Sequence, residues 1–122
     1  VCASSVSLTR SGIMADLRSE YLQGTLDVLI LKTLSWGPRH GYAIGKWLRE
    51  TTDGLLRVEE GALYPALHRL ERKKWIESEW GYSDNNRRAK YYQLTVRGRA
   101  QLRAQRAQWR AYAGAVALVL DA

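Results

Sequence analysis

The segment Glu60–Thr95 constrains the fold most, because the helical period of its apolar residues changes within it to the period of a strand. The helical part places three large apolar side chains on one face: Leu63, Leu67 and Leu70. Apolar and polar residues then alternate over 75–82 and again over 88–94, and a run of turn-forming residues separates the two stretches. The pattern predicts one helix followed by a β-hairpin.

Three further helices are predicted around this segment. Apolar residues at helical spacing indicate one helix over Gln23–Leu34 and another over 40–52. Thr95 is a favourable N-cap for a long last helix over 96–120. The predicted fold is therefore mainly α with a two-stranded β wing, which is a winged helix-turn-helix followed by a long C-terminal dimerisation helix.

The chain divides into three predicted parts. Residues 1–20 form a flexible N-terminal extension, residues 21–95 a winged-helix DNA-binding domain, and residues 96–122 the C-terminal dimerisation helix. Met14 is a candidate natural start, which would make residues 1–13 an upstream extension. The N-terminus lacks the basic region and apolar core of a secretion signal, and no apolar run approaches the ~20 residues of a membrane span. These features predict a cytoplasmic protein without a membrane partner.

An apolar seam along the last helix predicts that this helix pairs with a second copy. The seam residues recur at intervals of seven and four: Leu102, Trp109, Ala113, Val116 and Leu120. A helix that carries such a seam beyond a compact domain needs a partner surface. The alternative is that the helix folds back onto its own domain, because a pattern this short is also compatible with that arrangement.

The basic residues are concentrated in one region. Residues 60–110 hold 12 of the 19 Lys and Arg residues but only 5 of the 12 Asp and Glu residues, which accounts for the whole net charge of +7. A basic surplus confined to one region favours a polyanionic partner. A solvated, soluble surface is the alternative explanation.

Catalytic, metal and cofactor sites have little support in the sequence. The two histidines, His40 and His68, lack the spacing of metal ligands or of a nucleophile and its base. No glycine-rich phosphate loop is present. The single cysteine, Cys2, excludes an internal disulfide and a cysteine-cluster zinc site. We therefore expect no enzyme activity, no cofactor and no metal.

The predicted third helix and the hairpin turn carry side chains that suit DNA. The helix face opposite the leucines presents a histidine and three cations, with a tyrosine at its flank: His68, Arg69, Arg72, Lys73 and Tyr64. Arginine can form two hydrogen bonds to guanine in the major groove. The hairpin adds a cationic tip that can follow the backbone or enter the minor groove: Asn85, Asn86, Arg87, Arg88 and Lys90. The helix alone or the hairpin alone is weak evidence for DNA binding, but their order along the chain strengthens the prediction.

Three motifs resemble those of the PadR family of transcriptional regulators. The first is GALYPAL at 61–67 followed by Arg69-Leu70-Glu71. The second is Gly37-Pro38 followed by His40-Gly41-Tyr42, and the third is RRAKYYQLT at 87–95 followed by Gly98. Their order and spacing cover Leu22 to about Trp109. The resemblance implies a bacterial winged-helix homodimer, usually a repressor, whose second and third helices and wing hold DNA.

The resemblance, together with the basic helix face, gives a set of predicted DNA-binding residues: Tyr42, Tyr64, Pro65, His68, Arg69, Arg72, Lys73, Asn86, Arg87, Arg88 and Lys90. Two positions depart from the family pattern. Ala62 replaces a frequent Ser or Thr, and Glu59 replaces a frequent Ser or Asn, so the helix start lacks a hydroxyl for phosphate and has a poorer N-cap. One branch of the family binds flat aromatic drugs between paired tryptophans of the last helix, where Trp109 falls here. Trp109 is therefore either part of an effector site or a packing residue of the dimer.

These observations predict a homodimeric repressor that binds an inverted-repeat operator in double-stranded DNA, with half-sites about one helical turn apart. An aromatic small molecule is a candidate effector. The alternative function is a ligand-binding or protein-interaction module on the same scaffold without specific DNA binding. The basic helix face and the cationic wing argue against that alternative.

Overall fold

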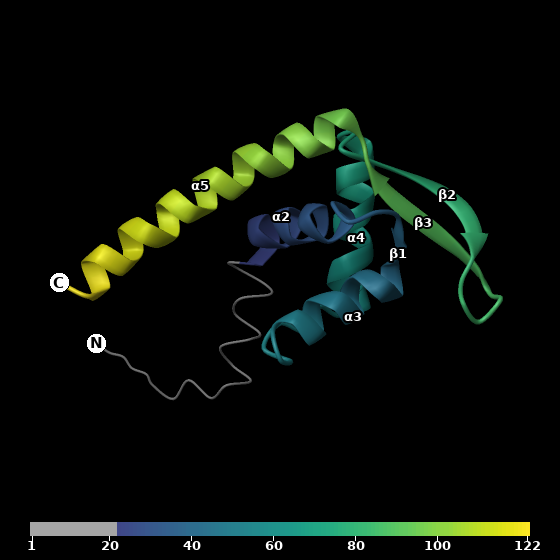
Figure 1. Cartoon of the computed structure of the whole chain (residues 1–122), viewed down its shortest axis with the longest axis horizontal. Coiled ribbons are helices and arrows are strands. Elements are labelled where there is room, and N and C mark those ends of the chain that lie inside the picture. The colour runs from purple at the N-terminus through teal and green to yellow at the C-terminus, as the bar shows by residue number, and fades with distance from the viewer. Residues whose placement is uncertain (1–21) are drawn as a thin grey trace.

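The computed structural model describes residues 22–122 (Figure 1). The predictions for the N-terminal extension, for Cys2 and for the start at Met14 lie outside this range. The elements are α2 (Leu22–Leu34), β1 (Arg39–His40), α3 (Gly41–Thr51), α4 (Glu60–Arg72), β2 (Ile76–Tyr82), β3 (Arg88–Leu94) and α5 (Val96–Leu120). The four predicted helices and both hairpin strands are therefore present.

A short strand that the sequence did not predict, β1, extends the hairpin into a three-stranded antiparallel sheet of order β1-β3-β2. Arg39 of β1 pairs with Tyr92 of β3, and His40 pairs with Tyr91. β2 pairs with β3 over its whole length. The prediction of a two-stranded wing is thus incomplete. β1, which directly precedes α3, pairs with β3 as a third strand.

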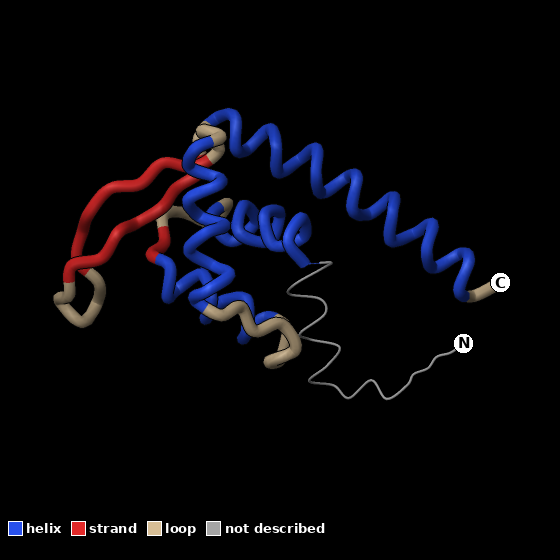
Figure 2. The backbone as a smooth tube through the Cα atoms, turned by 180° about the vertical axis from the view of Figure 1, so that it is seen from behind, coloured by secondary structure: helices blue, strands red, loops and turns tan. Residues whose placement is uncertain are grey.

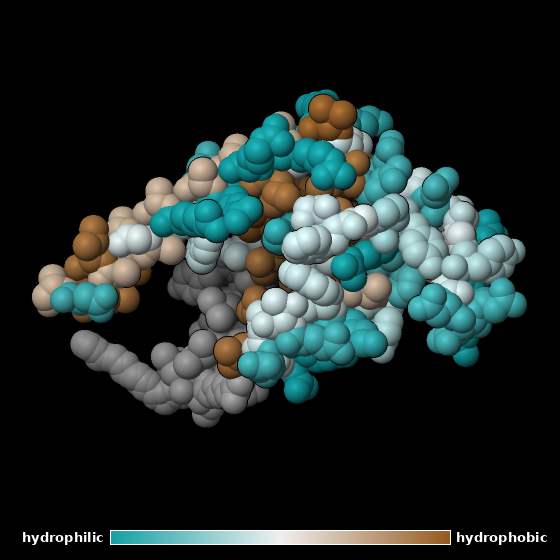
Figure 3. Space-filling model, in the orientation of Figure 1, coloured by the Kyte–Doolittle hydropathy of each residue, from teal (hydrophilic) through white to brown (hydrophobic). Residues whose placement is uncertain are grey.

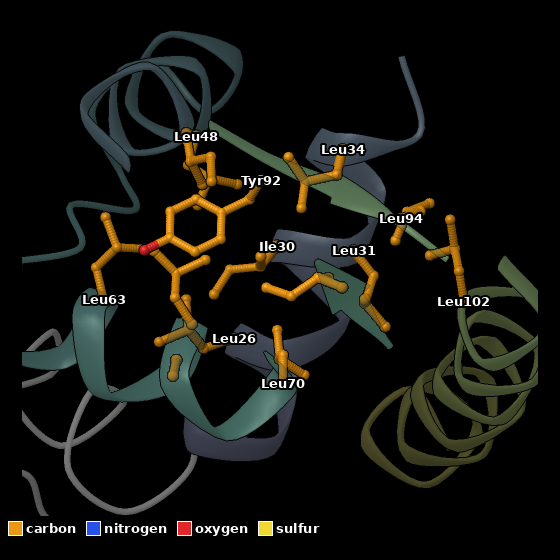
Figure 4. Packing of buried hydrophobic residues seen from close by; sticks show 14 residues of the cluster. Leu26, Ile30, Leu31, Leu34, Leu48, Leu63, Leu70, Tyr92, Leu94 and Leu102 are labelled. Atoms are coloured by element: carbon orange, nitrogen blue, oxygen red, sulfur yellow. The ribbon is translucent and has the colours of Figure 1, made fainter. Parts of the chain in front are cut away.

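The core lies where α2, α3 and α4 meet one face of the sheet (Figure 4). Its centre consists of fully buried aliphatic side chains from the three helices and β2: Ile30, Leu31, Leu34, Ile44, Leu48, Leu67, Leu70 and Ile76. Tyr92 and Leu94 are buried from the β3 side, as their spacing along the strand predicts. Each buried aliphatic side chain contributes about 1.5–3 kcal/mol. The shared core therefore holds α4 and the sheet in a fixed relation.

The C-terminal end of α4 is closed by a left-handed residue. Lys74 has a φ of 66°, and the Trp75 N–H donates to the Leu70 carbonyl over 3.1 Å. This is the Schellman arrangement, in which carbonyls of the last turn gain donors from beyond the helix. Glycine usually occupies the left-handed position, so this conformation of Lys74 lowers the stability of the fold relative to glycine.

The first turn of α5 is attached tightly to the rest of the domain. The Thr95 hydroxyl accepts from the Gly98 N–H over 3.0 Å, which confirms the predicted N-cap, and it donates to the Lys74 carbonyl over 2.7 Å. A Cβ built on Gly98 would lie 1.9 Å from the carbonyl oxygen of Trp75. Only glycine fits between α5 and this turn. We call residues 22–95 the head, to which α5 is joined here.

Beyond its first turns α5 leaves the head (Figures 1 and 2). Leu102, predicted as a dimer-interface residue, packs in the core of the single chain. Large apolar residues further along are exposed, from Val116 at 38% to Leu118 at 77%. Figure 3 shows hydrophobic residues gathered near the free end of α5 and hydrophilic ones over the wing. None of the described helices, α5 included, is long and apolar enough to cross a membrane.

Candidate nucleic-acid interface

The helix α4 turns one stripe of exposed residues away from the core. The stripe residues recur three or four positions apart: Gly61, Tyr64, Pro65, His68 and Arg72. The opposite face of α4 carries the buried leucines. The exposed side of the helix is therefore the side that the sequence predicts, and it presents an imidazole, a phenol and a guanidinium together.

Arg69 does not belong to this exposed stripe. Its Nη2 lies 2.5 Å from Oδ1 of Asp27, a buried residue of α2. A buried carboxylate requires a charged or hydrogen-bonding partner, and Arg69 supplies it. Arg69 was predicted to face DNA; in the structure its guanidinium joins α2 to α4 within the head.

The start of α4 lacks the side-chain cap that helices usually have. Glu59 occupies the N-cap position in extended conformation, and its side chain makes no cap hydrogen bond. Its carbonyl accepts from the backbone N–H groups of Ala62 and Leu63. The expected weakness of this helix start is therefore present, and Ala62 is half-buried without a hydroxyl to offer.

The start of α3 lies beside α4 and carries an exposed tyrosine. Nδ1 of His40 accepts from the Ala43 N–H over 3.2 Å and so caps the helix. Tyr42 follows with 67% of its surface exposed. The Tyr64 ring lies against Gly41, where an added Cβ would be 2.8 Å from the tyrosine oxygen. The glycine thus allows the first turns of α3 and α4 to approach each other.

The tip of the wing is a tight turn that presents two arginines. The Ser83 N–H donates to the Arg87 carbonyl, and the Asn86 N–H donates to the Ser83 carbonyl, both over 2.8 Å. Asn86 takes a φ of 59°, which asparagine tolerates better than most residues. Arg87 is exposed, and the Arg88 guanidinium lies 4.5 Å from the ring centroid of Trp80. This cation–π contact holds Arg88 against Trp80, on the side of the wing that faces α4.

Two other predicted cations have neighbours within the protein. Nζ of Lys90 lies 3.8 Å from Oε1 of Glu71 and 5.9 Å from the ring centroid of Tyr92. Nζ of Lys73 lies 4.6 Å from the ring centroid of Trp75. Lys73 is exposed and Lys90 is half-buried, so only Lys73 remains fully on the surface.

Open grooves separate the two helices from the wing. A groove of about 500 Å³ between α4 and the wing has a lining that includes Tyr64, His68, Trp80 and Arg88. A second groove of about 660 Å³ between α3 and the wing tip has a lining that includes Lys46, Asn85 and Arg87. His40 and Tyr42 line both grooves, so the two are contiguous. Three separate parts of the sequence therefore meet at one polar and aromatic surface.

Among the residues of this surface that were absent from the predicted set are His40, Lys46 and Trp80. Lys46 follows Tyr42 by four positions on the predicted second helix, so helical spacing could have identified it. Trp80 follows Ile76 by four positions on its strand, which places both on one face. The role of His40 depends on the fold, because its neighbour Tyr91 is distant in sequence and its ring lies 5.3 Å away.

Behind the groove, Tyr92 is a perturbed phenol. Burial raises the pKa of Tyr92 above its ordinary value of 10.0, and the charges of Glu71 and Tyr64 raise it further. The phenol therefore stays uncharged near neutral pH. Within residues 22–122 no three His, Cys, Asp or Glu side chains gather as a metal site would require.

The arrangement of α3, α4 and the hairpin defines a class of protein. Two helices joined by a turn and followed by a β-hairpin form a winged helix-turn-helix, in which the second helix enters the major groove of DNA. Here α4 is that second helix. Its exposed stripe and the wing line the same groove on the protein surface. The chain belongs to the PadR-like family of transcriptional regulators, whose model matches residues 30–104. It is accordingly a DNA-binding transcriptional regulator.

Solved structures and a curated relative are similar to this chain. A transcriptional regulator from Clostridium thermocellum is 32% identical, with 80% of this chain and 95% of that chain covered and a TM-score of 0.73. A PadR-like regulator from Bacillus cereus is 30% identical, with 85% and 99% covered and a TM-score of 0.73. A PadR family regulator from Eggerthella lenta is 34% identical, with 90% of each chain covered and a TM-score of 0.72. An uncharacterised protein of Lysinibacillus sphaericus is 32% identical over 93 residues, which cover 76% of this chain and 85% of that protein.

Proposed function

We propose that this chain is a homodimeric repressor that binds an inverted-repeat operator. The observation that carries the proposal is the exposed stripe of α4, which borders the groove whose other wall is the cationic wing. A major groove about 12 Å wide admits one α-helix. With α4 in the major groove of DNA, the wing lies over the adjacent sugar-phosphate backbone.

The proposed DNA contacts come from α3, α4 and the wing. They are Tyr42, Tyr64, Pro65, His68, Arg72, Lys73, Asn86, Arg87 and Arg88 from the predicted set, with Lys46 added. His68 and Arg72 project from the middle and end of the stripe and are the candidates for base contacts. The wing arginines contact phosphates, which position the protein without reading sequence. Arg69 is left out because it is paired with Asp27.

The free half of α5 is the proposed dimer interface. Its seam consists of Trp109, Ala113, Val116 and Leu120, of which the three large residues are exposed in the single chain. Large exposed apolar surface on a soluble protein marks an interaction site. A two-fold dimer presents two copies of α4, so half-sites about 10 bp apart fit successive major grooves on one side of the duplex. Repression then follows from occupying promoter DNA.

Trp109 packs the dimer in this proposal. Its ring centroid lies 6.0 Å from that of Tyr112, one turn along the same helix. A planar aromatic effector would instead insert beside these rings and change the separation of the two heads. Titration with planar aromatic compounds, followed by Trp109 fluorescence, distinguishes the two roles.

Selection of duplexes from a random pool tests the proposed function. We expect the selected sequences to share an inverted repeat and the footprint to have two-fold symmetry. Arg72→Ala should lower operator affinity by about 1–3 kcal/mol and relax specificity at one position of each half-site. Arg103→Ala, an equal change of charge on α5, is the control. Failure to enrich any duplex at low salt would overturn the proposal in favour of a ligand-binding or protein-interaction module.

A further inference from the structure

One carboxylate of α4 contacts both strands of the wing. Oε2 of Glu71 accepts from the Ser78 hydroxyl of β2 over 2.6 Å. Oε1 of the same group lies 3.8 Å from Nζ of Lys90 on β3. Each carboxylate oxygen of Glu71 therefore contacts a different strand of the wing.

The position of Glu71 gives these contacts control over the angle of the wing. The turn after α4 joins it to β2 through the left-handed Lys74, and Ile76 and Leu94 anchor the base of the hairpin in the core. Ser78 lies two residues beyond the start of β2, and Lys90 pairs with Trp80 further out. The contacts thus hold the hairpin part-way along its length, between its base and the tip (Figure 1).

The chemistry of the cluster fits a positioning role better than a direct contact with DNA. Lys90 is half-buried, and its ammonium faces the Glu71 carboxylate and the Tyr92 ring. The effect of Glu71 on the pKa of Tyr92 agrees with this close grouping. The neighbouring wing cation, Arg88, is stacked on Trp80 with its side chain exposed toward the groove. Lys90 and Arg88 therefore face different partners although they lie on the same strand.

We propose that Glu71 is a positioning residue for operator recognition: by holding Ser78 and Lys90, it sets the spacing between the exposed stripe of α4 and the arginines of the wing. This inference rests on the proposed function of the chain. In this proposal Lys90 does not contact a phosphate; it helps Glu71 to hold the wing in place. The spacing determines whether the wing meets its phosphates while α4 occupies the major groove.

The chain offers a matched control on the other face of the same hairpin. Glu77 of β2 accepts from Nε2 of Gln93 on β3 over 3.0 Å, so it also links the two strands. It lies on the outer face and is exposed. Glu71→Ala and Glu77→Ala remove the same charge, but the first removes two contacts between α4 and the wing, whereas the second removes one hydrogen bond within the wing.

The test compares these variants on the duplex selected by the wild-type protein and on a scrambled duplex. We expect Glu71→Ala to bind the selected duplex about tenfold more weakly than Glu77→Ala, the scale of coupling within a contacting network. Both variants should bind the scrambled duplex equally, because they carry the same net charge. Hydroxyl-radical footprints of Glu71→Ala should lose protection at the wing phosphates and keep it in the major-groove segment.

Two further variants separate positioning from simple loss of stability. Glu71→Gln keeps an oxygen acceptor for Ser78 and should recover part of the affinity, whereas Ser78→Ala should reproduce part of the loss without altering α4. Equal affinities and equal footprints for Glu71→Ala and Glu77→Ala would overturn the inference. If Glu71→Ala fails to fold, the same comparison with Ser78→Ala decides. A wild-type protein that selects no duplex would instead contradict the proposed function itself.

Discussion

The two halves of α5 differ in what they contact, although they form one continuous helix. The first turns are locked onto the head by Gly98 and Leu102, which are buried against Trp75 and the core. The second half carries Trp109 and Leu118 into solvent. The core is therefore completed within one chain, whereas the outer half of α5 leaves large apolar side chains exposed. Stability of the fold and assembly of the proposed dimer should respond to different substitutions along the same helix.

The largest expected effect comes from Gly98→Ala at the attached end. The new Cβ would lie 1.9 Å from the Trp75 oxygen, which is backbone and cannot move aside cheaply. We expect a loss of about 3 kcal/mol in the free energy of unfolding, measured by urea denaturation. Gly114→Ala is the control, because its Cβ meets no atom within 4 Å; it should stabilise the helix by up to about 1 kcal/mol. Equal effects at both glycines would break the comparison.

A leucine pair extends the comparison to packing. Leu102→Ala opens a cavity in the core and should cost about 2.5 kcal/mol of folding stability. Leu118→Ala removes the same atoms from an exposed site, at 77% exposure, and should change stability by less than about 0.5 kcal/mol. Thermal and urea unfolding of both variants measures the difference. A substantial loss of stability in Leu118→Ala would show that the free half is covered by its own chain.

Trp109→Ala tests the free half as an interface. A buried tryptophan is often a dominant interface residue, so its loss should weaken dimerisation by about 2 kcal/mol, or roughly thirtyfold in Kd. Sedimentation equilibrium over a concentration series gives this constant directly. Folding of the head should be unchanged, as judged by the circular dichroism spectrum of the dissociated chain. A monomeric wild-type protein at all concentrations would contradict the dimer proposal.

The smallest effect is expected at Lys74, in the turn between α4 and β2. Lys74→Gly relieves a φ of 66° and should stabilise the head by about 0.5–1 kcal/mol. Lys73→Gly is the control, since Lys73 has ordinary helical angles and gains nothing from glycine. Urea denaturation of the pair measures the difference. Destabilisation by Lys74→Gly would mean that the lysine side chain contributes more than its backbone costs.

Local sequence patterns predicted the hairpin strands and α5 well. Alternation identifies 88–94 because Tyr92 and Leu94 must share a buried face, and Thr95 identifies the start of α5 because its hydroxyl caps the Gly98 N–H. β1 was missed because two residues are too few to show alternation. Its pairing depends on where β3 lies in the folded chain.

The candidate site was harder to predict than the fold, because helical spacing does not reveal long-range partners. Arg69 borders the exposed face of α4 by spacing, but its guanidinium is paired with Asp27, forty-two residues earlier in the chain. Lys90 likewise looks like one more wing cation until Glu71 is placed beside it. His68 and Arg72 were placed well because their neighbours three and four positions away settle which way they face.

The Thr95 hydroxyl, which bonds both the Gly98 N–H and the Lys74 carbonyl, fixes the direction in which α5 leaves the head. The helix has 25 residues and so extends about 37 Å from that joint. By simple geometry, a rotation of roughly 5° at the joint moves the far end by about 3 Å over that length. In the proposed dimer, joined at the far ends, the stiffness of this joint in each protomer therefore limits how far the two heads can shift to match the pitch of DNA.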